Sequence, residues 1–248
     1  MDSSRARLAV WVSVAITVAL YVVPYGHTIG YPLVLLSTIA HESGHGVAAV
    51  LVGGTWQSFV LHSDGSGTAY TLGYDSNFAR AFVPAGGLCG PAVVAAFLLV
   101  LAARPLRARI GLGILGLTLL MTDAVLVRSV FGFAFVLFVA LIACGLALKA
   151  SASVAQLALA LAAVQLGLSV FSRGDYLFTP VARMADGAMP SDVALMSDAL
   201  WLPYWFWGAL CGAFSVAVLG VGLWLFLRAT RDGPTADAAL APLRRPGR

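Results

Sequence analysis

Long apolar runs alternate with short polar or glycine-rich stretches along most of the chain. Each run is close to the roughly 20 residues that a helix needs to cross the hydrocarbon core of a bilayer. The runs cover residues 8–23, 31–52, 78–103, 110–127, 130–148, 152–171 and 201–227. The pattern therefore predicts an all-α polytopic membrane protein with about six to seven transmembrane helices.

Two features of these runs leave the topology open. Arg5 and Arg7 give the first run the basic start of a signal peptide, but residues 22–25 offer no small-residue cleavage site, so we expect an uncleaved first span. Only Arg128 and Ser129 separate the fourth and fifth runs, which form either a tight hairpin or one interrupted element. Seven spans would put the two ends on opposite sides, yet both ends carry arginines, so the positive-inside rule gives no orientation.

Composition excludes a large soluble domain, because 60% of the residues are hydrophobic and only 10% are charged. The net charge of +4 predicts no nucleic-acid partner, since arginines clustered after the last run are explained by attraction to anionic lipid headgroups. We expect residues 1–229 to form a single multi-pass domain in the cell (plasma) membrane, followed by a disordered basic tail at 230–248. The oligomeric state is open.

The three cysteines, Cys89, Cys144 and Cys211, are odd in number and far apart in apolar segments. This predicts buried, inert thiols and neither a disulfide framework nor a cysteine metal site.

A β-hairpin is predicted at residues 55–73, directly after Gly53-Gly54 ends the second apolar helix. Its strands are residues 55–62 and 68–72, and the turn signal is Asp64-Gly65-Ser66-Gly67. One interpretation is a plain extramembrane connector. The other is an edge strand that holds a substrate backbone extended, because a peptide bond within a helix is inaccessible to attack.

The second apolar helix, residues 31–53, contains the sequence His41-Glu42-Ser43-Gly44-His45. Histidines spaced i, i+4 project from one helix face and can bind one metal ion, and the glutamate between them lies close enough to activate water. Glu42 is the only glutamate of the chain, so chance assembly of the motif is on the order of one in a thousand. The motif predicts Zn2+ bound by His41 and His45, with Glu42 as the general base.

A third zinc ligand must come from elsewhere in the chain. Asp175, just after the sixth apolar run, is the first candidate; its alternative role is a helix-end carboxylate paired with Arg173. Asp123 lies inside the fourth run, where a carboxylate needs a partner. Asp192 follows Ser191, and an N-cap role for a short helix is preferred there.

Glycines in the third and last runs predict close helix packing. Gly86 and Gly90, and again Gly208 and Gly212, are spaced to let another helix approach closely. Pro91 is expected to start or kink its helix, which would leave the preceding glycines in a partly irregular segment.

From about residue 31 to residue 215 the chain resembles the site-2-protease-like intramembrane metallopeptidases, in particular their compact M50B-like branch. The matching sequences are His41-Glu42-Ser43-Gly44-His45-Gly46, Gly53-Gly54, Asp64-Gly65-Ser66-Gly67-Thr68, Gly86-Gly87-Leu88-Cys89-Gly90-Pro91, Asp175-Tyr176, Ser191-Asp192 and Trp207-Gly208. The resemblance implies zinc bound by His41, His45 and a distant aspartate, here Asp175, with Glu42 activating water. The Asn-Pro-x-x-Asp-Gly or Leu-Asp-Gly sequence that carries the family's third ligand is absent.

The sequence therefore predicts an intramembrane zinc metalloendopeptidase that cleaves membrane-embedded protein substrates. The alternative is a catalytically inactive metal-binding membrane protein, such as a scaffold, chaperone or ion-handling protein. Glu42 favours the enzyme, because a purely structural zinc site needs ligands but no general base.

Overall fold

The structure is a computed structural model, which describes residues 2–172, 176–184 and 187–231. Its elements are α1 (Asp2–Val22), α2 (Gly26–Leu51), β1 (Thr55–Leu61), β2 (Gly67–Leu72), α3 (Asn77–Ala102), α4 (Pro105–Val125), α5 (Val130–Lys149), α6 (Ala152–Ser172), η1 (Tyr176–Phe178), β3 (Val181–Met184), β4 (Gly187–Pro190), α7 (Asp192–Leu200) and α8 (Tyr204–Arg231). The predicted helical membrane protein with a small hairpin after the second helix is confirmed. The predicted tail lies outside the described residues from residue 232 on.

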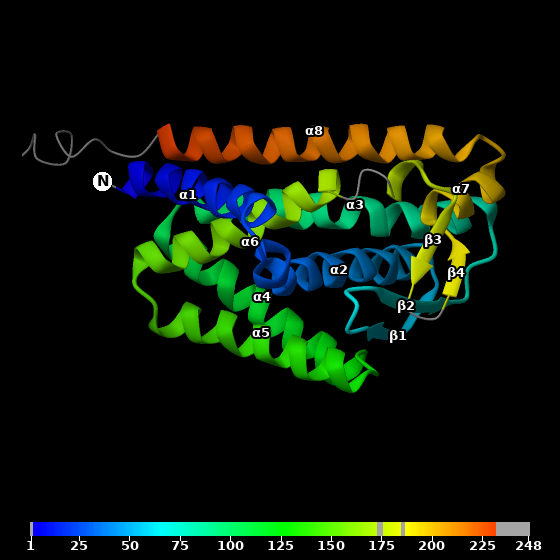
Figure 1. Cartoon of the computed structure of the whole chain (residues 1–248), viewed down its shortest axis with the longest axis horizontal. Coiled ribbons are helices and arrows are strands. Elements are labelled where there is room, and N and C mark those ends of the chain that lie inside the picture. The colour runs from blue at the N-terminus through cyan, green and yellow to red at the C-terminus, as the bar shows by residue number, and fades with distance from the viewer. Residues whose placement is uncertain (1, 173–175, 185–186, 232–248) are drawn as a thin grey trace, which may run out of the picture.

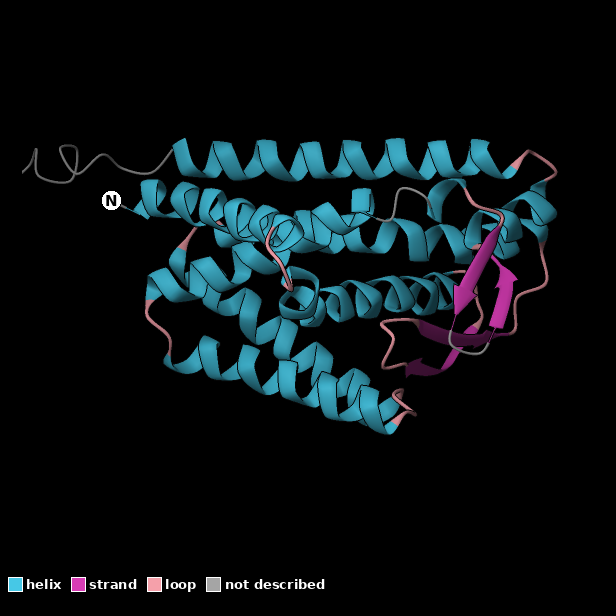
Figure 2. Ribbon diagram, in the orientation of Figure 1, coloured by secondary structure: helices cyan, strands magenta, loops and turns pink. Residues whose placement is uncertain are grey.

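Five helices, α3, α4, α5, α6 and α8, are long and apolar enough to cross a membrane. The first two helices, α1 and α2, follow one another from the N-terminal end of the bundle toward the β-strands (Figure 1). The N-terminus and the end of α8 lie at the same end of the bundle, unlike the ends of a seven-span chain. The strands gather at the opposite end (Figure 2).

Among the described residues, basic side chains concentrate at the end of the bundle that holds the start of α1 and the end of α8. This end comprises the start of α1, the α3–α4 connection with the start of α4, the end of α5 and the end of α8 (Figure 1). These segments carry Arg5, Arg7, Arg104, Arg107, Arg109, Lys149, Arg228 and Arg231.

The fourth and fifth apolar runs form a tight hairpin of two helices, α4 and α5, and their connection also pairs with β1. Phe59 donates its N–H to the carbonyl of Leu126 at 2.8 Å and accepts from the N–H of Arg128 at 2.9 Å. The hydroxyl of Ser129 donates to the carbonyl of Leu61 at 2.9 Å. This connection therefore occupies the outer edge of β1 and leaves β2 as the other edge of the sheet.

Close packing of α2 on α3 places the site, and it depends on the glycines that the sequence singled out. A Cβ added at Gly86 would lie 2.6 Å from the carbonyl oxygen of Gly44, and one at Gly90 would lie 2.9 Å from that of Ala40. Pro91 does not start its helix, since α3 runs from Asn77 through this proline and the glycines before it are helical. Packing of α3 against α2, α6 and α8 holds it continuous.

The second glycine pair, Gly208 and Gly212 of α8, packs against Leu177 and not against another long helix. A Cβ at Gly208 would overlap the carbonyl of Leu177, which lies in the short 3-10 helix η1. The close approach in α8 thus fixes the segment that precedes β3 and α7.

Candidate metal centre

Three side chains of the α2 motif gather in one cluster. The possible ligand atoms of His41, Glu42 and His45 all lie within 4.8 Å of one another. The Nε2 atoms of the two histidines are 3.1 Å apart, as the i, i+4 spacing predicts.

Asp192 brings a carboxylate to these histidines from the first residue of α7. Its Oδ2 lies 3.1 Å from Nε2 of His41, and its Oδ1 lies 3.4 Å from Nε2 of His45. Asp192 is only 6% exposed. The N-cap role expected for Asp192 is wrong, because the hydroxyl of Ser191 accepts the capping bond from the N–H of Ala194.

A short hairpin that the sequence did not reveal positions Asp192. Strands β3 and β4 pair antiparallel, with Val181 opposite Pro190. At their base Ser191 donates its N–H to the carbonyl of Pro180 at 3.1 Å and its hydroxyl to that of Thr179 at 2.6 Å. These two hydrogen bonds fix Ser191, the residue directly before Asp192, at the start of α7.

Packing of α7 on α3 completes the placement of Asp192. The buried side chains Val193 and Met196 of α7 share one apolar cluster with Leu88 of α3 and Cys211 of α8. Helix α3 also packs against α2, so the histidines and the carboxylate are held by one continuous set of contacts.

The donor set fits a tetrahedral zinc ion. Ligands bonded to zinc at 2.0–2.1 Å stand about 3.3–3.4 Å apart, and the distances among His41, His45 and Asp192 are 3.1–3.4 Å. The Oδ2 atom of Asp192 is buried and accepts no hydrogen bond from the described residues. It forms an ion pair with His41 in this structure and is placed to bind a metal ion together with Nε2 of that histidine.

Contacts with α3 set the tautomer and position of His45. Its Nδ1 lies 3.0 Å from the carbonyl oxygen of Val83. Because a carbonyl can only accept, Nδ1 carries the proton and Nε2 presents its lone pair to the site. A Cβ at Gly87 would overlap the imidazole, so only glycine lets this ring lie on α3.

Glu42 is held by β2. It is 6% exposed, and its Oε2 accepts a hydrogen bond from the N–H of Ala69 at 2.7 Å. A Cβ at Gly67 would lie 2.9 Å from Cγ of Glu42. The predicted hairpin therefore contacts the predicted base directly.

The Ala69 N–H belongs to the edge of β2 that faces away from β1. Phe59 stands opposite Ala69, and the backbone groups of Phe59 bond the α4–α5 connection instead. The pair Phe59–Ala69 is thus a non-hydrogen-bonded one, and the backbone groups of Gly67, Ala69 and Thr71 point outward.

The other two aspartates considered as zinc ligands, Asp175 and Asp123, are not seen in this cluster. Asp175 lies outside the described residues. Asp123 is buried in α4, and its Oδ1 has no hydrogen-bond partner among the described residues. Among those residues, the metal-ligating cluster contains no part of α4.

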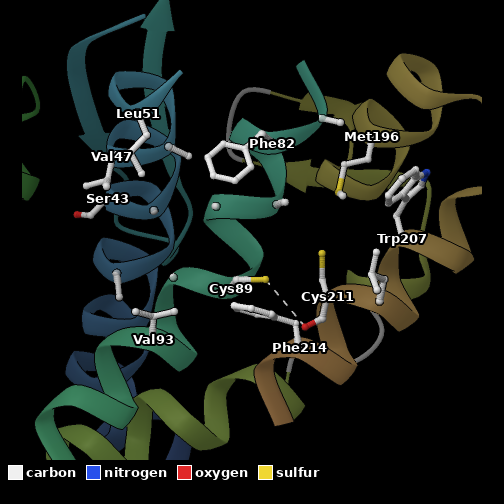
Figure 3. A pocket seen from close by; sticks show the side chains of 18 of the residues that line it. Ser43, Val47, Leu51, Phe82, Cys89, Val93, Met196, Trp207, Cys211 and Phe214 are labelled. Carbon is white, nitrogen blue, oxygen red and sulfur yellow. Dashed lines mark hydrogen bonds between the residues drawn. The ribbon is translucent and has the colours of Figure 1, made fainter. Parts of the chain in front are cut away.

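An apolar groove of about 610 Å³ opens between α2, α3, α7 and α8 (Figure 3). Ser43 and Val47 line it from α2, so it lies on a face of that helix other than the one that carries Glu42. The thiols of Cys89 and Cys211 both line it, and Sγ of Cys89 lies 4.0 Å from the carbonyl oxygen of Cys211. The two cysteines are far apart in the sequence but lie near each other in the fold, and both are free thiols.

A comparison with protein families matches residues 11–222 to the Peptidase M50B-like family. No curated protein and no solved structure matches the chain.

Proposed function

The chain belongs to the Peptidase M50B-like family, and from this membership and the site we propose that it is an intramembrane zinc metalloendopeptidase. One observation carries the proposal. The side chains of His41, His45 and Asp192, from two separate helices, converge at distances that suit one zinc ion, and Glu42 lies beside them. We assign Asp192 as the third ligand on these contacts.

The division of roles follows from the contacts of each residue. When bound, zinc supplies Lewis acidity, which lowers the pKa of a water molecule and polarises the scissile carbonyl. Glu42 takes the proton of the attacking water and returns it to the leaving amine. The N–H of Ala69 holds the carboxylate of Glu42 in place, and the carbonyl of Val83 holds the ring of His45.

Membrane-embedded proteins are the proposed substrates. Five helices are long and apolar enough to span a bilayer, and a substrate helix must unwind before its peptide bonds can react. The outward edge of β2 can hold the unwound segment by strand addition. The N–H of Ala69 on this edge is bonded to Glu42, so a strand added at the neighbouring Thr71 brings a substrate peptide bond near the general base.

The experiment compares Glu42→Gln with the wild type in detergent-purified protein, with zinc content and cleavage of a membrane-embedded reporter as the two measurements. The substitution keeps the shape and the Ala69 contact but removes the base, so we expect unchanged zinc and cleavage lowered by at least about 100-fold. Undiminished cleavage contradicts the mechanism. Zinc in the wild type without cleavage of any reporter favours a metal-binding protein that is not an enzyme.

A further inference from the structure

A second apolar cavity, of about 400 Å³, lies between α1, α3, α6 and α8. This volume falls within the roughly 300–1,000 Å³ of small-molecule sites. Its walls are built mainly from Val10, Val14, Leu99, Val164, Leu219 and Leu223. It differs in one respect from the groove beside the metal centre, because a cation, Arg7, is among its lining residues.

The guanidinium of Arg7 is oriented by α8. Its Nε donates to the hydroxyl oxygen of Thr230 at 3.1 Å. The hydroxyl of Thr230 in turn donates to the carbonyl of Leu227 at 3.0 Å, so its oxygen is free to accept from Arg7. The two terminal nitrogens of Arg7 form no hydrogen bond with the described residues, and no described carboxylate lines the cavity. Arg7 is thus an oriented, positively charged side chain whose terminal N–H groups have no partner among the described residues.

Arginine with free terminal donors at one end of an apolar cavity suits an amphiphile with an anionic head. A guanidinium binds phosphate through paired donors, and the apolar walls suit an acyl chain. Arg7, Phe226 and Leu227 line the part of the cavity at the start of α1 and the end of α8, two segments in which Arg5, Arg228 and Arg231 add positive charge. This surplus favours a headgroup with net negative charge over a zwitterionic one.

We propose that this cavity binds an anionic phospholipid, with one acyl chain between α1, α3, α6 and α8 and the phosphate on Arg7. Arg7 belongs to the start of α1, at the end of the bundle opposite the strands, and the proposal does not depend on the proposed protease activity (Figure 1). A lipid bound there contacts the first and last helices together, so it stabilises their packing.

The test uses the full chain in detergent, with phosphatidylglycerol and phosphatidylcholine added in turn and lipid binding followed by native mass spectrometry. We expect the wild type to bind phosphatidylglycerol more tightly, and Arg7→Gln to lose at least about fivefold in that affinity. Arg80→Gln is the matched control, since Arg80 lies at the start of α3, at the opposite end of the bundle. It should bind as the wild type does.

Two further measurements keep the result decisive. Circular dichroism and the elution volume in size-exclusion chromatography report whether Arg7→Gln is folded. Arg7→Lys should keep part of the preference because it keeps the charge. Equal affinity of the wild type for the two lipids overturns the proposal. So does a folded Arg7→Gln protein that still prefers phosphatidylglycerol.

Discussion

The carboxylate of Asp192 lies 3.1 Å from Nε2 of His41 and links α7 to α2. Helices α7 and α2 make few other contacts with each other, because α7 packs mainly on α3 and α8. A metal ion shared by Asp192 and the histidines would therefore fasten α7, and with it the β3–β4 hairpin, to the helix that carries the motif.

Removal of the metal should loosen α7 more than the rest of the bundle. Chelation leaves the buried Asp192 carboxylate without its main partner, so we expect faster amide hydrogen exchange in α7. Helix α5, which contributes no residue to the cluster, serves as the internal reference. Equal acceleration in both helices contradicts this account.

Gly87→Ala should weaken zinc binding by about 10–100-fold, the range for residues that orient a metal ligand. The new methyl group overlaps the imidazole of His45 and forces it away from Val83. Zinc affinity measured by competition with a chelator checks the prediction. Gly220→Ala in α8 is the matched control, because its Cβ meets no atom within 4 Å and zinc binding should not change.

Thr71→Pro should reduce cleavage and leave zinc content unchanged. The N–H of Thr71 points to the outer edge of β2, so proline removes a donor for the substrate strand without removing a bond to β1. Loss of one such bond lowers kcat/KM by about two- to tenfold. Thr71→Ala controls for the lost side-chain bond to Tyr74. Equal rates in the proline and alanine variants contradict strand addition at this edge.

Acid should reduce the contribution of Asp192 to the stability of the metal-free protein. Burial raises the pKa of its carboxyl, but the neighbouring charges of His45 and His41 lower it by more, so the pKa of Asp192 lies well below its ordinary value. A pKa lower in the folded than in the unfolded state stabilises the fold above the unfolded pKa of about 3.9. This contribution is lost as the pH falls below that value.

The measurement compares melting temperatures of the metal-free wild type and Asp192→Asn. The wild type should be more stable at pH 5 and above, and its advantage should shrink as the pH is lowered from about 4. An advantage that grows on acidification contradicts the sign of the pKa shift.

Local patterns were sufficient to predict the elements that carry the motif. The i, i+4 histidines define one face of α2, and Gly53 and the 64–67 turn delimit the hairpin, with β1 and β2 within one residue of the predicted strands. The glycines that pack α2 on α3 also follow from their spacing. Each of these features depends on neighbours within a few residues.

Asp192 could not be selected in the same way, because its role depends on a contact across the fold. A Ser-Asp pair after proline is typical of a helix start, and Ser191 does cap α7. Only the β3–β4 hairpin and the packing of α7 on α3 turn the adjacent carboxylate toward His41. The requirement for glycine at position 87 could not be predicted either, since it follows from the position of the His45 ring against α3.

Zinc content of the purified wild type and two aspartate variants tests the central claim most directly. We expect near-stoichiometric zinc in the wild type and its loss in Asp192→Ala, whereas Asp198→Ala, an exposed aspartate of the same helix, should keep the metal. Asp175→Ala, measured beside them, should also retain zinc. Zinc retained in Asp192→Ala and lost in Asp175→Ala would contradict the assignment of Asp192 and favour the sequence-based one.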